Sequence, residues 1–338
     1  MIKEVLAKLA EGMSLSFEEA SAFVDAIAKG DVTDGPIAGF LTGLRIKGEQ
    51  PEELAGCVSA LRAHAVSVPH SQTTVFDCCG TGGDGANTFN ISTASAIVVA
   101  ACGVPTAKHG NRAVSSACGS ADLLEATGAK IDISPKHSAR LLDEIGFCFL
   151  FAPLYHPATK RVATVRRELG FRTMFNLMGP LLNPARATHQ IIGTSSPEKA
   201  SLLASVQAHI GGTRMITYSN SLGVDVLLPS GRNILCRWTT SGLESDHLRL
   251  PQFLENGFML SHIIGGDREF NVQLLSEVLS GVESEYSRVT ALNAAFGLEF
   301  VGKVGTLDDG YRMALDALRT GAAKNLFETY RFMTHEAC

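Results

Sequence analysis

The chain has 338 residues, of which 45% are hydrophobic and 19% charged, and its formal net charge is −5. This composition is typical of a folded protein with a large apolar core, and the acidic balance argues against a nucleic-acid-binding surface. The eight cysteines lack CxxC spacing and mostly lie in apolar runs, which indicates buried free thiols in a reducing compartment. There is no signal-peptide pattern, and the longest apolar run, 96–102, is too short to span a bilayer. We therefore expect a cytoplasmic protein.

Residues 1–66 are predicted to form a small all-helical domain. Helical patterns occupy 18–30, 34–48 and 51–66, and the first of them ends at Gly30. Pro51 suits the first turn of the last helix, where the neighbouring acidic residues favour the positive end of the helix dipole. The polar stretch 67–72 is a plausible hinge.

From residue 73 onwards, short apolar strands alternate with helices. Strands are predicted at 73–79, 104–108, 130–134, 147–153, 189–195 and 214–219. Helices are predicted between them, and two or three more in the tail, 279–334. Alternation of this kind is typical of parallel crossover units. We therefore predict an α/β fold in which residues 73–338 form a doubly wound, mostly parallel sheet flanked by helices, with 157–185 at the junction of the two domains.

The stretch 76–93, FDCCGTGGDGANTFNIST, places a glycine-rich loop between a strand and a helix. Gly80, Gly82 and Gly85 satisfy GxGxxG, but a dinucleotide site also needs an acidic residue about 20 positions further on. Residues 86–121 contain no Asp or Glu, and the Gly-Lys-Ser/Thr of a P-loop is absent. Asp84 inside the loop would repel a pyrophosphate unless a metal intervened. The pattern therefore disfavours NAD and P-loop nucleotides.

The loop still predicts an anion site. Asn90 or Ser92 can cap the following helix, whose free N–H groups and dipole attract a negative group. Lys108 and Arg112 follow the next strand, and ligands of open α/β sheets bind at this end of the strands. We expect both basic residues to bring positive charge to the mouth of the glycine loop.

Five strings in this order resemble the anthranilate phosphoribosyltransferase family: GFLTGLRIKGEQPEELAG, GTGGDGANTFNIST, KHGNR, GSADLLEATG and YHPATKRVATVRRELGFRTMFNLMGPLLNP. The resemblance covers nearly the whole chain. It implies a helical N-terminal domain that builds a homodimer, and a large α/β domain. It also implies transfer of phosphoribose from phosphoribosyl pyrophosphate (PRPP) to anthranilate in tryptophan biosynthesis, with Mg²⁺.

The resemblance assigns residues to each substrate. For PRPP it implies Gly80, Gly82, Gly83, Asp84, Asn90, Ser92, Thr93 and Lys108. For anthranilate it implies Gly80, Asn111, His156, Arg166 and Gly179, and for magnesium Ser92 and Asp225. No residue is assigned as a general acid or base. Arg166 would orient the acceptor, because a guanidinium fork matches a carboxylate.

The sequence departs from the family where a His-Gly pair and two adjacent acids are usual. Ser219 and Asn220 align with the His-Gly pair. Asp225 aligns with the first acid and Val226 with the second. Ala117 stands where many members have lysine. The alternating segment 223–228 also fits a strand that carries one exposed aspartate.

Other functions remain open on the sequence alone. A divergent paralogue that uses another aromatic acceptor would explain the altered acidic pair, although Asn111, His156 and Arg166 are retained. A catalytically weak relative that binds nucleic acid is disfavoured by the acidic charge. A nucleoside phosphorylase would share the architecture but carries a phosphate signature that differs from KHGNR.

Overall fold

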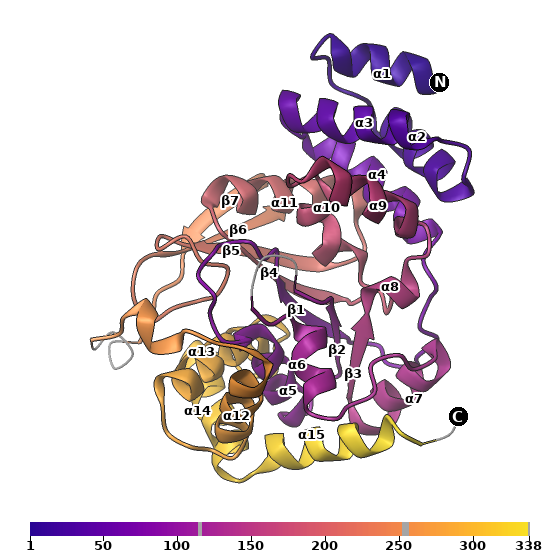
Figure 1. The fold of residues 1–338 in the computed structure, drawn as a ribbon. Coiled ribbons are helices and arrows are strands. Elements are labelled where there is room, and N and C mark those ends of the chain that lie inside the picture. Colours follow the sequence, from indigo (N-terminus) through magenta and orange to yellow (C-terminus); the bar gives the residue numbers. More distant parts are fainter. Residues whose placement is uncertain (114–116, 252–256, 337–338) are drawn as a thin grey trace.

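The computed structural model describes residues 1–113, 117–251 and 257–336. Its sheet has seven strands in the order β3-β2-β1-β4-β5-β6-β7. The strands are β1 (Phe76–Gly80), β2 (Thr106–Gly110), β3 (Phe147–Phe151), β4 (His189–Thr194), β5 (Arg214–Asn220), β6 (Asn233–Thr239) and β7 (Gly242–His247). Strands β1 to β5 pair in parallel, and β6 and β7 are antiparallel. The predicted doubly wound, mostly parallel sheet is confirmed (Figure 1).

The N-terminal part is helical, as predicted, and stands away from the sheet at one end of the molecule (Figure 1). Its helices are α1 (Ile2–Ala10), α2 (Phe17–Lys29), α3 (Asp34–Lys47) and α4 (Pro51–Ala63). Ser16 and Glu19 form a capping box that starts α2, and Gly30 ends it with a φ of 86°. Pro51 occupies the first turn of α4, where its missing N–H costs nothing.

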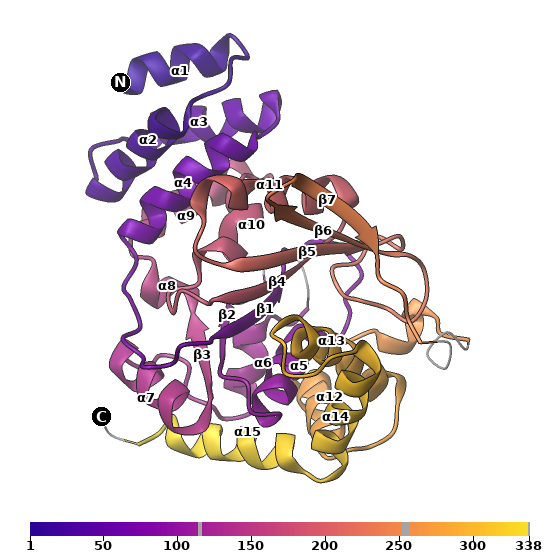
Figure 2. The ribbon, with the colours of Figure 1, turned by 180° about the vertical axis from the view of Figure 1, so that it is seen from behind.

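The sheet separates two apolar cores. Cys78 and Ile191 point into the first core, and their sequence neighbours Cys79 and Ile192 point into the second, as the two-residue period of a strand requires. The first core is covered by α5 (Ile91–Ala101), α6 (Ser120–Ala126), α7 (Pro135–Ile145), α12 (Arg268–Leu279), α13 (Glu285–Phe300), α14 (Leu307–Arg319) and α15 (Ala322–Met333). Figure 2 shows α5, α13 and α15 together below the sheet.

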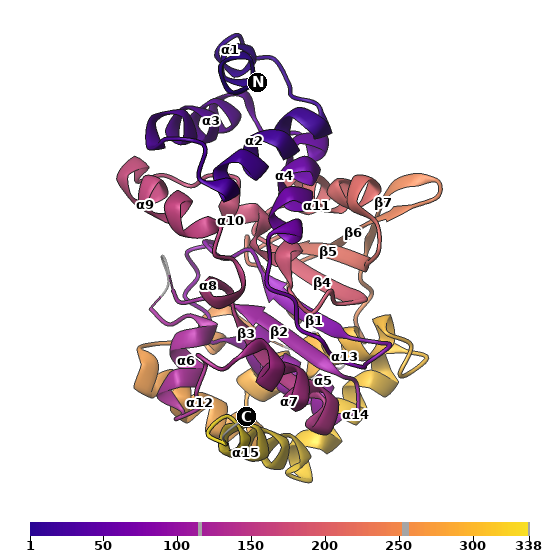
Figure 3. The same ribbon diagram turned by 90° about the vertical axis from the view of Figure 1, so that its right-hand side faces the viewer.

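The second core joins the N-terminal helices to the opposite face of the sheet. It is completed by α9 (Thr159–Leu169), α10 (Phe175–Met178), the 3₁₀ turn η1 (Gly179–Leu182) and α11 (Pro197–Ile210). Val162 and Met174 from this middle segment pack with Phe40 of α3 in one buried cluster. Figure 3 shows α9 and α10 between the N-terminal helices and the sheet. The remaining short elements are α8 (Ala152–Tyr155) and η3 (Leu260–Ile263).

One predicted strand is wrong, and one alternative interpretation is excluded. Residues 130–134 alternate as a strand should, with Ile131 and Ile133 buried, but they pair with no strand, and β3 is the edge strand of the sheet. Segment 223–228 is not a strand either. Val226, Leu227 and Leu228 are all buried in a bent connection between β5 and β6, so burial there does not alternate.

Seven cysteines in the described part of the chain are free thiols, and Cys338 lies outside it. Of the helices formed by residues 1–113, 117–251 and 257–336, none combines the length and the apolar character that a membrane span needs.

Candidate active site

The order of the strands locates the site. In the run β3-β2-β1-β4-β5 the chain winds one way from β1 through β2 to β3 and the other way from β4 to β5. Open α/β sheets bind ligands at such a switch point, beyond the carboxyl ends of the strands. The glycine loop follows β1 at this point, and Asn111 and His156 follow β2 and β3 at the same edge of the sheet.

The glycine loop is shaped by left-handed glycines and by Asp225. Gly82, Gly83 and Gly85 have φ values of 68°, 71° and 76°, which other residue types rarely adopt. The backbone N–H of Gly82 donates to Asp225 Oδ2 at 2.7 Å. A Cβ on Gly80 would lie only 2.1 Å from the same oxygen. The segment between β5 and β6 therefore packs directly on the loop.

Asp84 and Asp225 form a close acidic pair. The backbone N–H of Asp225 donates to Asp84 Oδ2 at 3.4 Å. Burial, and next the Asp84 charge, raise the pKa of Asp225. Two carboxylates that repel each other provide the hard oxygen ligands that Mg²⁺ prefers, and a divalent cation would relieve the repulsion. The described residues contain no cluster of three or more His, Cys, Asp or Glu side chains arranged for a metal, so the other ligands would be water or substrate oxygens.

The start of α5 differs from the predicted cap. Asn90 stands at the N-cap position, but its side chain makes no capping bond. Its amide instead donates to the Cys118 carbonyl at 3.0 Å, and its Oδ1 accepts from Asn271 at 3.1 Å. Capping fails because these two partners draw the side chain away. The N–H groups of Ile91 and Thr93 donate instead to the carbonyls of Phe89 and Asn90, and the N–H of Ser92 has no partner among the described residues. Thr93 is fully buried and its hydroxyl has no hydrogen-bond partner among the described residues.

Lys108 lies beneath the loop rather than at its mouth. Its side chain is 2% exposed, and its Nζ donates to the carbonyl of His109 at 3.4 Å. The neighbouring Asp77 is fully buried, and burial raises the pKa of this carboxyl while the Lys108 charge opposes the shift. Lys108 therefore places a positive charge below the glycine loop, and the prediction that it lies at the mouth of the loop is wrong.

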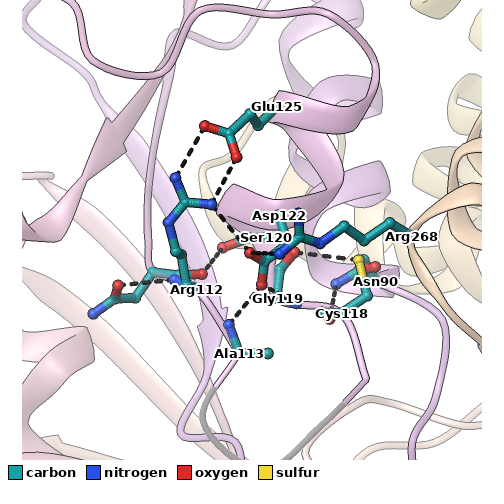
Figure 4. Close-up of polar contacts among 10 residues, drawn as sticks. Asn90, Arg112, Ala113, Cys118, Gly119, Ser120, Asp122, Glu125 and Arg268 are labelled. Carbon is teal, nitrogen blue, oxygen red and sulfur yellow. Dashed lines mark hydrogen bonds and ion pairs between the residues drawn. The ribbon is translucent and has the colours of Figure 1, made fainter.

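Arg112 does not face the loop, contrary to the prediction. Its guanidinium binds both oxygens of Glu125 at 2.7 and 2.9 Å and reaches Asp122 at 3.2 Å (Figure 4). Asp122 also accepts from Arg268 at 3.3 Å and from the backbone N–H groups of Ala113 and Gly119. Two carboxylates on the same face of α6 thus neutralise Arg112.

The candidate acceptor residues begin with a pair of buried histidines. The rings of His109 and His156 pack edge to face, with their centroids 5.3 Å apart. Burial lowers the pKa of His156 to about 4. Burial, and next the charge of His156, lower the pKa of His109 to about 3. Both rings are neutral at pH 7, and neither nitrogen of His156 makes a hydrogen bond of normal geometry with a described residue. A Cβ on Gly179 would meet no atom within 4 Å, which leaves open space there.

Arg166 is partly buried on α9. Its Nη2 donates to Asn176 Oδ1 at 3.1 Å, and its guanidinium lies 5.5 Å from the centre of the Phe175 ring. Burial lowers the pKa of Arg166, because desolvation penalises the charge. Asn111 is exposed, and its Oδ1 accepts from the N–H of Arg112 at 2.8 Å.

Sequence reasoning missed Arg172 and Asn271. Arg172 lies in the string that carries the family resemblance, but nothing in the pattern indicates that it reaches Gly83. Asn271 belongs to α12 and holds Asn90 across the site. Both contacts join segments far apart in the sequence, so one sequence carries no signal for them.

Comparisons with known proteins agree with this geometry. The profile of the glycosyl transferase family a/b domain matches residues 72–324, and that of its helical bundle domain matches 3–65. An anthranilate phosphoribosyltransferase of Moorella thermoacetica is 41% identical over 329 residues, 96% of this chain and 95% of that protein.

Two solved structures share the whole fold. The anthranilate phosphoribosyltransferase of Thermus thermophilus superposes with a TM-score of 0.88 at 36% identity and covers 98% of this chain and 99% of its own. That of Saccharomyces cerevisiae, in complex with PRPP and Mg, superposes with a TM-score of 0.90 at 26% identity, over 98% and 97%. The resemblance read from the sequence is confirmed, and this chain belongs to the anthranilate phosphoribosyltransferase family.

Proposed function

We propose that this protein transfers the phosphoribosyl group of PRPP to anthranilate, giving N-(5-phosphoribosyl)anthranilate and pyrophosphate in tryptophan biosynthesis. The observation that carries the proposal is the glycine loop at the switch point of the sheet, with Asp225 packed against it, in a chain 41% identical to a named member of the family.

In the reaction, the bond between ribose C1 and the pyrophosphate oxygen breaks, and its electron pair leaves with the pyrophosphate. The anthranilate nitrogen then bonds to C1 and gives up a proton to water. The protein has to stabilise the leaving charge and aim a weak nucleophile. The N–H groups of Gly83, Asp84 and Gly85 in the loop and of Ser92 in the first turn of α5 are unpaired within the described part of the chain. With the charge of Lys108 beneath them, they would stabilise the leaving group. Because His109 and His156 are both neutral, neither can offset the negative charge of the leaving pyrophosphate.

Arg166 is proposed to orient the anthranilate carboxylate. Its Nη2 is held by Asn176 and its plane is held over Phe175, so few conformations remain to be lost when a carboxylate binds. Asn111, His156 and Gly179 are proposed to line the same acceptor site together with Gly80. A Cβ on Gly179 would meet no protein atom within 4 Å, so the acceptor could approach the backbone there.

Mg²⁺ is the proposed cofactor. Asp84 and Asp225 would hold it, with Ser92 as a hydroxyl ligand. Bound there, the ion would offset the acidic pair and the charge of the pyrophosphate. Asp225 must be ionised to bind it, which the raised pKa opposes in the absence of the ion.

Residues 1–66 are proposed to form a dimerisation domain, with 73–338 as the catalytic domain. Met1, Met13 and Ile46 of the helical part are 48%, 44% and 82% exposed, and a dimer that covered them would gain from removing their apolar surface from water. Sedimentation analysis would measure the mass, and a monomer at micromolar concentration would refute the dimer. The cytoplasmic location remains a prediction from the cysteine usage.

The activity is tested by following the loss of anthranilate fluorescence with PRPP and Mg²⁺. Calorimetry should show saturable PRPP binding that Gly82→Val abolishes, because a β-branched residue does not adopt the φ of 68° that Gly82 has. A Cβ at position 82 meets no protein atom within 4 Å and so projects into the space left for the ligand. Gly305→Ala is a control, since Gly305 also has open space but lies between α13 and α14. No anthranilate loss at millimolar PRPP would refute the function.

A further inference from the structure

Arg172 joins the acceptor side of the molecule to the glycine loop. A Cβ built on Gly83 would lie 2.5 Å from its Cζ and 2.6 Å from both terminal nitrogens. The guanidinium therefore lies with its face against Gly83, in the space that any larger residue would fill. Both this contact and the φ of 71° favour glycine at position 83.

The backbone on both sides of Arg172 is held in place, while its side chain is exposed. Gly170 ends α9 in the left-handed conformation, with a φ of 68°, and turns the chain toward the loop. The next backbone N–H after Arg172, that of Thr173, donates to Asn176 Oδ1 at 3.0 Å. The same oxygen accepts from Arg166. One asparagine thus binds the Arg166 side chain and holds the backbone next to Arg172.

No hydrogen bond or ion pair satisfies the Arg172 guanidinium among the residues that the structure describes. In contrast, Arg112 and Arg268 at the same edge are bound to carboxylates. Although Gly83 directly precedes Asp84, Arg172 does not pair with it within 4.0 Å. The guanidinium is a planar cation with unpaired N–H donors, and it lies against the glycine loop. This arrangement suits an anion that can accept two hydrogen bonds at once.

We propose that Arg172 is a further binding residue of the site, which grips the pyrophosphate of the donor substrate and of the product; this rests on the proposed function. The two arginines then bind different substrates. Arg166 holds the acceptor carboxylate, and Arg172 holds the leaving group. Because Asn176 holds Arg166 and the backbone next to Arg172, one segment would contact both substrates.

The test compares Arg172→Gln and Arg172→Lys with Arg167→Gln. Arg167 is an exposed arginine on α9 for which no hydrogen bond or ion pair with a described residue is present. Each protein is titrated by calorimetry with PRPP and with inorganic pyrophosphate in the presence of Mg²⁺, and its steady-state kinetics are measured. A charge-assisted bond corresponds to about 10- to 100-fold in affinity.

We expect Arg172→Gln to weaken PRPP and pyrophosphate by about 10- to 100-fold, with the anthranilate KM at saturating PRPP nearly unchanged. Arg172→Lys should be intermediate, because it keeps the charge and loses the fork. Equal pyrophosphate affinity in Arg172→Gln and Arg167→Gln would overturn the proposal, as would a loss confined to the anthranilate KM. If the wild type bound pyrophosphate but never consumed anthranilate, the proposed transferase activity would be refuted. The pyrophosphate titrations would still test whether Arg172 binds pyrophosphate.

Discussion

A carboxylate oxygen of Asp225 occupies the space into which a side chain on Gly80 would extend, with Oδ2 2.1 Å from the ideal Cβ position. The end of β1 and the β5–β6 connection are therefore fitted to each other, and the fit sets the acidic group beside the glycine loop. The absence of a side chain at position 80 is required by this contact rather than by backbone conformation, since Gly80 does not have a positive φ.

Gly80→Ala should displace Asp225 and destabilise the protein by roughly 1–3 kcal/mol, the usual cost of overpacking a tight site. It should also raise the Mg²⁺ concentration needed for half-maximal activity. Gly179→Ala is the matched comparison, because its Cβ would meet no protein atom within 4 Å. That variant should keep its melting temperature and lose affinity for anthranilate. Equal melting temperatures in the two variants would contradict the packing argument.

The stability should depend on pH through Asp225. Its pKa is raised in the folded state by burial and by Asp84, so between the ordinary aspartate value of about 4 and the raised value the folded protein holds a proton that the unfolded chain has lost. Stability without metal therefore falls as pH rises through this window, and the penalty is absent below it.

Asp225→Asn removes this titration while keeping an acceptor for the Gly82 N–H. In metal-free buffer, the variant should melt near the wild-type temperature at pH 4 and above it at pH 8. Mg²⁺ should raise the melting temperature of the wild type much more than that of the variant. A constant difference in melting temperature across the pH range would rule out Asp225 as the titrating group.

Val226→Glu should destabilise the fold rather than restore a metal ligand. Val226 is 4% exposed within the first core, and an unpaired carboxylate there costs about 2 kcal/mol or more. Val282→Glu is the control, because Val282 is 47% exposed, and it should change stability by at most about 0.5 kcal/mol. Chemical denaturation measures both. A stable Val226→Glu protein with a lower Mg²⁺ requirement would show that this side chain can face the cleft.

Arg166→Ala should raise the anthranilate KM or lower kcat, with PRPP affinity nearly intact. A hydrogen bond to a charged group contributes roughly 1.5–3 kcal/mol, which corresponds to about 10- to 150-fold. Aniline, which lacks the carboxylate, should react equally poorly with the wild type and the variant. An equal loss for anthranilate and aniline would contradict the assigned role. Circular dichroism should show that the variant keeps its fold.

The local patterns predicted the parallel sheet and the helical N-terminus, because strand length, helix period and stop signals such as Gly30 are encoded within a few residues. The antiparallel pair β6 and β7 was not predicted: β7 is Gly242–His247, a polar and largely exposed edge strand without the usual apolar alternation. The predicted position of Arg112 was wrong because its side chain pairs with carboxylates on α6 and does not face the loop. The contact between Asp225 and Gly82 joins distant segments. Only the family resemblance indicated that Asp225 belongs to the site.

The core shared by the N-terminal helices and the middle segment determines what can be removed from this protein. Phe40 of α3 packs with Val162 and Met174, which flank Arg166 in the chain. A chain shortened to the α/β part would retain the glycine loop and the sheet but expose the apolar side of α9 and α10 to water. Such a fragment would be expected to lose anthranilate binding before PRPP binding, because the helical part supports the segment that carries Arg166.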